Sequence, residues 1–411
     1  RIEPGLPLAE PRTGFADLCR GLFNPAIFYD GEHSVGVVIG AFDAYVKEAE
    51  WPELMWIVNT MIPKVLGSLE LIDINHEDLL SGFISLFKSL AAGFGRTVTL
   101  EKIKPIFLER LQRLESTLAN IGSDWPSFAI ITVYLIGILA PIQCEATEVG
   151  TTLRRFLCSL ALSNAPLDSL QISVVYLSKM IPLHEVLMAS LWEGVVHPRP
   201  IVRCATARLL SCAICNVGES MTTNRIVPAL ITLANDPEIS VKTATIPVFG
   251  ILVINSTNKE VEDKTYFQLQ NFLSDPVARD NHPTLLQLVV TLGQIVAHCD
   301  SWFRDEVIVP QLAATAAFTQ QLTNQTRRLD LAVALVDAFS NSVYCSLSKS
   351  TIITALLPGL KHLEQVCMQS LPEHVETVLS MIKEAESRSE PPKPIERSSS
   401  SLTLSMATSN V

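Results

Sequence analysis

A dipeptide that ends in proline recurs in this chain at a constant spacing. His197-Pro198, Asp236-Pro237 and Asp275-Pro276 lie 39 residues apart each time. Behind the first two, a valine and a basic residue recur at one offset, as Val202-Arg203 and Val241-Lys242. A fixed period of this length is typical of a solenoid, in which each repeat packs mainly against its neighbours.

A second series of prolines gives the same period. These prolines stand inside apolar segments, and they are Pro63, Pro105, Pro228, Pro310 and Pro358. The two longest spacings between them, 123 and 82 residues, are three and two multiples of 41. Because proline removes one backbone hydrogen bond and its ring displaces the preceding turn, we expect a bend in the first helix of each repeat.

One repeat shows the expected anatomy most clearly. Its sequence predicts a helix over 225–234, a turn over 235–239 and a helix over 240–254, and Asp236 is placed to cap the second helix. A repeat of about 40 residues with two helices is of the HEAT or the armadillo class. The proline in the first helix and the Asp-Pro turn resemble the HEAT consensus and favour that class.

The resemblance to HEAT repeats also implies a role for three polar residues. In that family, the turn aspartate and a basic residue six positions later form a ladder between neighbouring repeats. Carried over to this sequence, the ladder includes Asp236 and Lys242, with Arg203 as the basic residue of the preceding repeat. His197 stands at the aspartate position of that preceding repeat, so the ladder is expected to be incomplete there.

Extending the period over the chain predicts an all-α protein, an α-solenoid of about nine HEAT-type helix pairs over residues 14–386. The expected repeats are 14–50, 52–95, 99–143, 146–182, 183–218, 222–256, 260–299, 304–342 and 348–386. Residues 1–13 are predicted to be a linker from a preceding region. Residues 387–411 are rich in serine and proline, which predicts a disordered tail.

Composition restricts the expected partners. The chain is 48% hydrophobic with a net charge of -11, and no cluster of Lys and Arg interleaved with aromatic residues occurs in it. Nucleic acid is therefore not an expected partner. The nine cysteines lack framework spacing, which is typical of reduced thiols in a cytoplasmic protein. Cys212 and Cys215, with His298-Cys299 as a distant completion, suggest a zinc site, but two buried small residues on one helix are the favoured interpretation.

One uncharged stretch, residues 126–144, is just long enough to span a membrane. Asp124 and Glu145 flank it, Pro141 interrupts it, and no Lys or Arg lies near either end. These features favour a central helix that is buried on all sides, so no transmembrane segment is expected.

The sequence carries no motif of enzyme chemistry. It lacks a glycine-rich phosphate loop, a nucleophile elbow and paired histidines at metal spacing, so we expect no catalytic residues, no bound metal and no cofactor. In the tail, Ser409 and Val411 fit the C-terminal peptide that PDZ domains bind. The serine run over 398–401 is a candidate for phosphorylation or a plain solvated linker.

Two family resemblances complete the interpretation. Residues 194–249 are similar to the HEAT repeats of the phosphatase scaffold subunit. The run of repeats followed by a serine-rich tail resembles the C-terminal part of Rab-binding proteins that combine a LisH motif, a coiled coil and HEAT repeats. Neither the LisH motif nor the coiled coil lies within these residues.

The second resemblance implies a non-catalytic scaffold and names its partners. It implies an effector of a recycling-endosome Rab GTPase that tethers this compartment to the trans-Golgi network. It also implies cholesterol transport with oxysterol-binding protein and peripheral membrane association through partners. The alternative function is a regulatory scaffold of a protein phosphatase.

Overall fold

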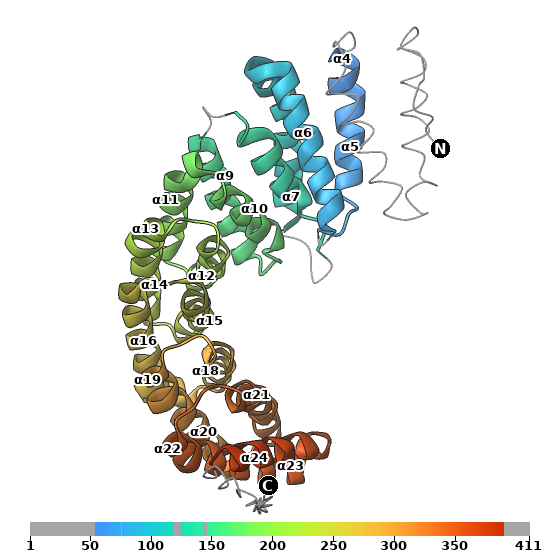
Figure 1. The fold of residues 1–411 in the computed structure, drawn as a ribbon. Helices are drawn as coiled ribbons and strands as arrows, with labels where there is room; N and C mark the ends of the chain where they lie inside the picture. The colour runs from blue at the N-terminus through green and yellow to red at the C-terminus, as the bar shows by residue number, and fades with distance from the viewer. Residues whose placement is uncertain (1–53, 75, 119–124, 143–145, 390–411) are drawn as a thin grey trace, which may run out of the picture. The chain divides into compact units, whose positions relative to one another are not determined.

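The computed structural model describes residues 54–74, 76–118, 125–142 and 146–389, and within these ranges every regular element is a helix (Figure 1). The predicted all-α solenoid is confirmed. The first expected repeat, over 14–50, lies outside the described residues. The chain divides into two compact units, one up to Gln287 and one from Leu288 onward.

The helices of the first unit, with η marking π or 3₁₀ segments, are α4 (Leu54–Trp56), η1 (Ile57–Met61), α5 (Ile62–Leu69), α6 (Glu77–Val98), η2 (Thr99–Ile103), α7 (Lys104–Leu118), α8 (Ala129–Thr132), η3 (Val133–Leu139), α9 (Ala146–Leu162), α10 (Asp168–Ser178), η5 (Ile181–Leu183), α11 (His184–Val195), α12 (Pro200–Ile214), α13 (Glu219–Met221), η6 (Thr222–Ile226), α14 (Val227–Ala234), α15 (Ile239–Asn255), α16 (Lys259–Ser274) and α17 (Pro276–Asp280). Helix α18 (His282–Ile295) contains the division between the units.

From α9 onward, the first unit is built from stacked helix pairs. The two helices of a repeat pack against each other, as α11 with α12 and α14 with α15. Neighbouring repeats pack first helix on first helix, as α9 on α11, and second helix on second helix, as α12 on α10 and α15. Figure 1 shows α11, α14 and α16 along one side and α12 and α15 along the other. The first unit therefore has a first-helix layer and a second-helix layer.

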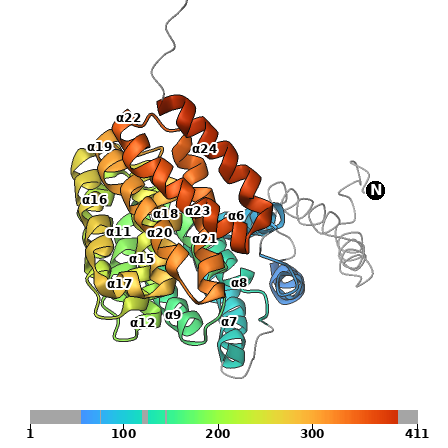
Figure 2. The same ribbon diagram turned by 90° about the horizontal axis from the view of Figure 1, so that it is seen from below.

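The second unit contains α19 (Ser301–Phe303), η7 (Arg304–Ile308), α20 (Val309–Gln321), α21 (Gln325–Val343), α22 (Lys349–Thr351), η8 (Ile352–Leu356), α23 (Leu357–Ser370), η9 (Pro372–His374) and α24 (Val375–Ser389). Helix α24 packs along α23 and α21 (Figure 2). It continues to Ser389, three residues beyond the predicted end of the repeats at 386. The rest of the predicted tail lies outside the described residues, as does the predicted linker over 1–13.

The uncharged stretch forms a core helix. Residues 129–139, which make up α8 and η3, are all buried. The ring of Tyr134 stacks on Phe107 with centroids 5.5 Å apart, and Phe107 meets Phe87 edge to face at 4.9 Å. Apolar side chains on every side of this helix account for its continuous hydrophobic sequence, and the predicted buried helix is confirmed.

No helix in the described ranges is by itself both long and apolar enough for a membrane crossing, although α10 and the helix over Ile181–Val195, bent by 116°, pass that test as a pair by length and composition.

A π turn precedes each proline of the second series. In the best-matched repeat, the N–H of Val227 donates to the carbonyl of Thr222, five residues back, and Pro228 follows directly. The same bond from the residue before the proline closes η1, η2, η7 and η8. The wider turn makes room for the ring, which otherwise meets the carbonyl four residues back. The predicted disturbance at proline thus takes the form of a π turn within a continuing helix.

Replacing Pro228 with alanine is expected to change the free energy of unfolding by less than about 1 kcal/mol. The π turn already accommodates the ring, and proline also restricts the unfolded chain. In an unadapted helix interior, a proline costs about 3 kcal/mol, so its removal is strongly stabilising there. Hydrogen exchange over residues 219–234 measures the change. A gain near 3 kcal/mol would show that the π turn does not relieve the proline.

Candidate functional site

A partly buried ion pair joins two neighbouring repeats of the first unit. Arg203 lies on α12, and Asp236 lies in the turn between α14 and α15 of the next repeat. The Arg203 Nε donates to Asp236 Oδ2 at 2.6 Å and its Nη2 donates to Oδ1 at 2.8 Å. Only 12% of the arginine and 8% of the aspartate side chain are exposed. The hydrogen bonds to Asp236 raise the pKa of Arg203, so the guanidinium is held in its charged form.

The same two side chains also order the adjacent turns. Asp236 Oδ1 accepts a hydrogen bond from the backbone N–H of Glu238 at 2.9 Å, at the start of α15. Arg203 Nη1 donates to the carbonyl of His197 at 2.8 Å. His197 stands where the HEAT consensus has an aspartate, and here its backbone carbonyl accepts a hydrogen bond from Arg203.

A second pair repeats the pattern one repeat later. Lys242 on α15 places its Nζ 3.5 Å from Asp275 Oδ2, and Asp275 Oδ1 caps α17 through the N–H of Val277 at 2.9 Å. In both pairs the basic residue precedes its aspartate by 33 positions. The partners of Asp236 and Lys242 therefore lie in the neighbouring repeats. Asp275 was recognised in the sequence only as a turn residue, and its position 39 residues after Asp236 was the signal for this role.

A set of partly exposed side chains along α12 and α15 is here called the second-helix face. Its residues are at least partly exposed, and each one on α15 follows its counterpart on α12 by 39 positions. They are Ile201, Cys204, Arg208 and Cys212 on α12 with Cys215 directly after it, and Ser240, Thr243, Pro247, Ile251 and Ile254 on α15. The isoleucines at its two ends, Ile201 and Ile254, are 40% and 42% exposed.

The charge of this face differs from that of α11 and α16 in the first-helix layer. Neither α12 nor α15 contains an aspartate or a glutamate. Helices α11 and α16 of the other layer carry Glu185, Glu193, Glu260, Glu262 and Asp263. Arg208 is exposed, and none of the ion pairs among the described residues involves it.

Three thiols lie on the second-helix face. Burial raises the pKa of Cys204 and of Cys212, so both remain protonated at neutral pH. Cys215 is exposed and Cys212 is half-buried, so the interpretation of these two cysteines as buried residues is wrong. They follow the uncovered side of α12. Within the described ranges, no three His, Cys, Asp or Glu side chains gather in a way that could hold a metal ion.

A groove opens between α10 and α12 at one end of this face. It has a volume of about 450 Å³, and Ile201, Cys204 and Arg208 of α12 line one wall. Gln171 and Asp168 line the other wall from α10. The second-helix face is thus hollowed where its exposed arginine lies.

A second groove, of about 490 Å³, lies in the first-helix layer between α11 and α14. Trp192 is 44% exposed at its edge, and Met188 and Leu210 form a buried floor. Arg225 Nη2 lies 3.0 Å from Glu185 Oε2 beside this groove. Its charged groups are therefore paired, in contrast to Arg208.

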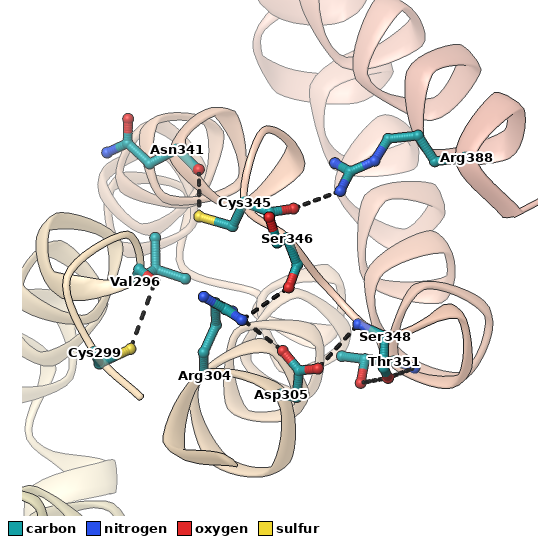
Figure 3. A network of polar contacts seen from close by, with 10 residues as sticks. All are labelled: Val296, Cys299, Arg304, Asp305, Asn341, Cys345, Ser346, Ser348, Thr351 and Arg388. Carbon is teal, nitrogen blue, oxygen red and sulfur yellow. Dashed lines mark hydrogen bonds and ion pairs between the residues drawn. The ribbon is translucent and has the colours of Figure 1, made fainter. Parts of the chain in front are cut away.

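The loop between α21 and α22 in the second unit is held by hydrogen bonds from η7 (Figure 3). Arg304 Nη2 donates to the carbonyl of Ser346 at 2.8 Å. Asp305 Oδ2 accepts from the N–H of Ser348 at 2.9 Å. These bonds to the backbone fix the loop to the first helix of the preceding repeat.

Arg388 on α24 holds the same loop from the other side (Figure 3). Its guanidinium donates to the carbonyls of Val343 and Cys345. Tyr344, between these two residues, has 77% of its surface exposed. An ordered loop thus presents a tyrosine, a residue type that is enriched at interface hot spots. The tail residues Ser409 and Val411 lie outside the described residues.

Comparisons with known proteins give the family context. The sequence model of the family described as RAB11-binding protein RELCH C-terminal domain matches residues 127–384. The RAB11-binding protein RELCH homolog of Danio rerio is 35% identical over 381 residues, which are 91% of this chain and 32% of the relative. The RAB11-binding protein RELCH of Homo sapiens is 34% identical over 344 residues, 83% of this chain and 28% of the relative.

This chain spans about a third of the length of these relatives. Among solved structures, the one described as Kap121p bound to RanGTP aligns over 90% of this chain and 41% of its own, with 13% identity and a TM-score of 0.45. The helix pairs of this chain, rather than that likeness, establish its fold.

Proposed function

The chain belongs to the RELCH family, and from this premise we propose that it is a non-catalytic scaffold that binds the Rab GTPase Rab11. The observation that carries the proposal is the family match over residues 127–384, whose relatives are described as RAB11-binding proteins. Stacked helix pairs provide the extended, ordered surface that such binding needs.

The finer part of the proposal concerns the cellular role. We propose that the chain acts in the cytoplasm, held peripherally on recycling endosomes and at the trans-Golgi network through its partners. There it tethers the two compartments and supports cholesterol transport together with oxysterol-binding protein. These roles rest on the family resemblance. They are proposed for a full-length protein, because this chain matches only about one third of its relatives' length.

Binding to nucleotide-loaded Rab11 tests the central claim. A Rab effector distinguishes the GTP state because the γ-phosphate orders the switch segments of the GTPase. We expect the purified chain to bind GTP-loaded Rab11 with a Kd below about 10 μM, and the GDP form at least about tenfold more weakly. Biolayer interferometry with both nucleotide states measures the two constants.

The control arm uses the alternative partner. A protein phosphatase catalytic subunit, immobilised in the same assay, is expected to give no saturable binding. Binding to the phosphatase subunit without binding to Rab11 would replace the proposed function with that of a phosphatase scaffold.

A further inference from the structure

The second-helix face carries no carboxylate on either of its two helices. Aspartate and glutamate make up 42 of the 411 residues, yet the 15 residues of α12 and the 17 of α15 include none. Burial does not account for this, because the ten positions of the face are at least partly exposed. Exposed helix positions ordinarily favour glutamate and lysine, so the composition of this face differs from that of a plain solvated surface.

The side chains present suit a protein interface. Isoleucines are exposed at both ends of the face, and thiols, small hydroxyls and Pro247 lie between them. Depletion of charge together with a retained arginine is typical of the central part of interfaces. Arg208 stands beside the groove between α10 and α12, and it takes part in no ion pair of the described residues. A carboxylate of a binding partner would form an ion pair with the Arg208 guanidinium.

The ion pairs between the repeats give this surface a defined shape. Arg203 and Lys242 both turn toward the intra-repeat turns, where they bind Asp236 and Asp275. The charges of Arg203 and Lys242 are thus neutralised by ion pairs within the chain. Arg208 lies on the same helix as Arg203 but forms no ion pair with the described residues. The positions of α12 and α15 are fixed by these pairs, so little ordering is needed when a partner binds.

Resting on the proposed function, we propose that Rab11 docks on the second-helix face and presents apolar side chains and at least one carboxylate that binds Arg208. The carboxylate complements the Arg208 guanidinium, which forms no ion pair among the described residues, on a face whose two helices carry no acidic side chain. The first-helix layer, whose charges around the α11–α14 groove are paired, is not the contact surface.

Charge reversal at Arg208 tests the proposal. Arg208→Glu is expected to weaken binding of GTP-loaded Rab11 at least about tenfold, because it places a carboxylate opposite the partner's own. Arg225→Glu in the first-helix layer changes the net charge by the same amount and is expected to leave the affinity within about twofold. Circular dichroism of both variants checks that the exposed substitutions leave the helices intact.

The native thiols provide an independent footprint. Cys215 is exposed on the face, and its alkylation by a maleimide is expected to slow at least about fivefold when Rab11 is bound, because the interface excludes the reagent. The matched probe is Ala189→Cys at an exposed position of α11, whose alkylation rate is expected to stay the same. Mass spectrometry of the labelled peptides reports both rates in one sample.

The outcomes separate the two proposals. If the unmodified chain does not bind GTP-loaded Rab11, the proposed function fails and this inference fails with it. If the chain binds but Arg208→Glu and Arg225→Glu behave alike and Cys215 is not protected, only the docking surface is wrong. If Arg208→Glu abolishes cosedimentation with phosphatidylcholine–phosphatidylserine vesicles without changing the Rab11 affinity, the face is a membrane contact and the proposal is overturned.

Discussion

Replacing Arg203 with methionine is expected to lower the local free energy of unfolding around α12 and α15 by about 3 kcal/mol, because it leaves the Asp236 carboxylate without its guanidinium. That carboxylate is 8% exposed, so water cannot fully replace the lost partner. The carbonyl of His197 also loses a donor. Hydrogen exchange of the α12 and α15 amides is expected to accelerate by a factor on the order of 100.

Local exchange is the right measurement because a solenoid is stabilised mainly by contacts between neighbouring repeats. A global melting temperature averages over repeats that the substitution does not touch. The matched control is Arg225→Met, which breaks a pair whose side chains are 58% and 69% exposed. It is expected to cost less than about 0.5 kcal/mol, since exposed pairs contribute little.

A second substitution tests the cause of the loss. Asp236→Asn removes the unpaired charge but keeps an oxygen that accepts from the Glu238 N–H. Added to Arg203→Met, it is expected to restore at least about 1 kcal/mol. A double variant no more stable than Arg203→Met alone would show that lost packing of the arginine stem, rather than the unpaired carboxylate, causes the effect.

Sequence reasoning predicted the repeat well because its signals are local. In the best-matched repeat, the predicted first helix ends at 234, as α14 does, and the second begins within one residue of α15. Asp236 does not cap α15 as predicted, because its carboxylate accepts from the N–H of Glu238, which precedes the helix. This bond and the fixed φ of Pro237 order the turn between the helices, and neither effect needs a distant contact. A backbone feature of the same local kind is Gly95 inside α6, whose φ of 73° suits a residue without a side chain.

Features that depend on packing between repeats were not predictable in the same way. The resemblance implied a ladder of Asp236, Lys242 and Arg203 between neighbouring repeats, but it did not assign the individual pairs and did not include Asp275. Which aspartate a lysine reaches depends on the rotation between stacked pairs, and no local motif encodes it. Likewise, Cys212 and Cys215 match the small residues of a buried stripe, and only the stacking of α12 beside α15 leaves their side uncovered.

The largest effect on stability is expected in the second unit, where Phe339→Ala should cost about 4 kcal/mol. Phe339 on α21 is fully buried, and its ring lies against Gly359 of α23, where an added Cβ would be 2.8 Å from the ring. A glycine has no side chain that can move into the space left by the ring, so the cavity persists and the cost stays near the upper part of the usual range.

Hydrogen exchange of α21 and α23 measures this cost, and Phe318→Ala on α20 is the matched control. Phe318 loses the same ring but is 39% exposed, so less than about 1.5 kcal/mol is expected from its removal. Equal effects of the two substitutions would contradict the proposed role of the α21–α23 contact. Because the repeats are coupled mainly through neighbours, the protection of α12 and α15 should stay unchanged in both variants.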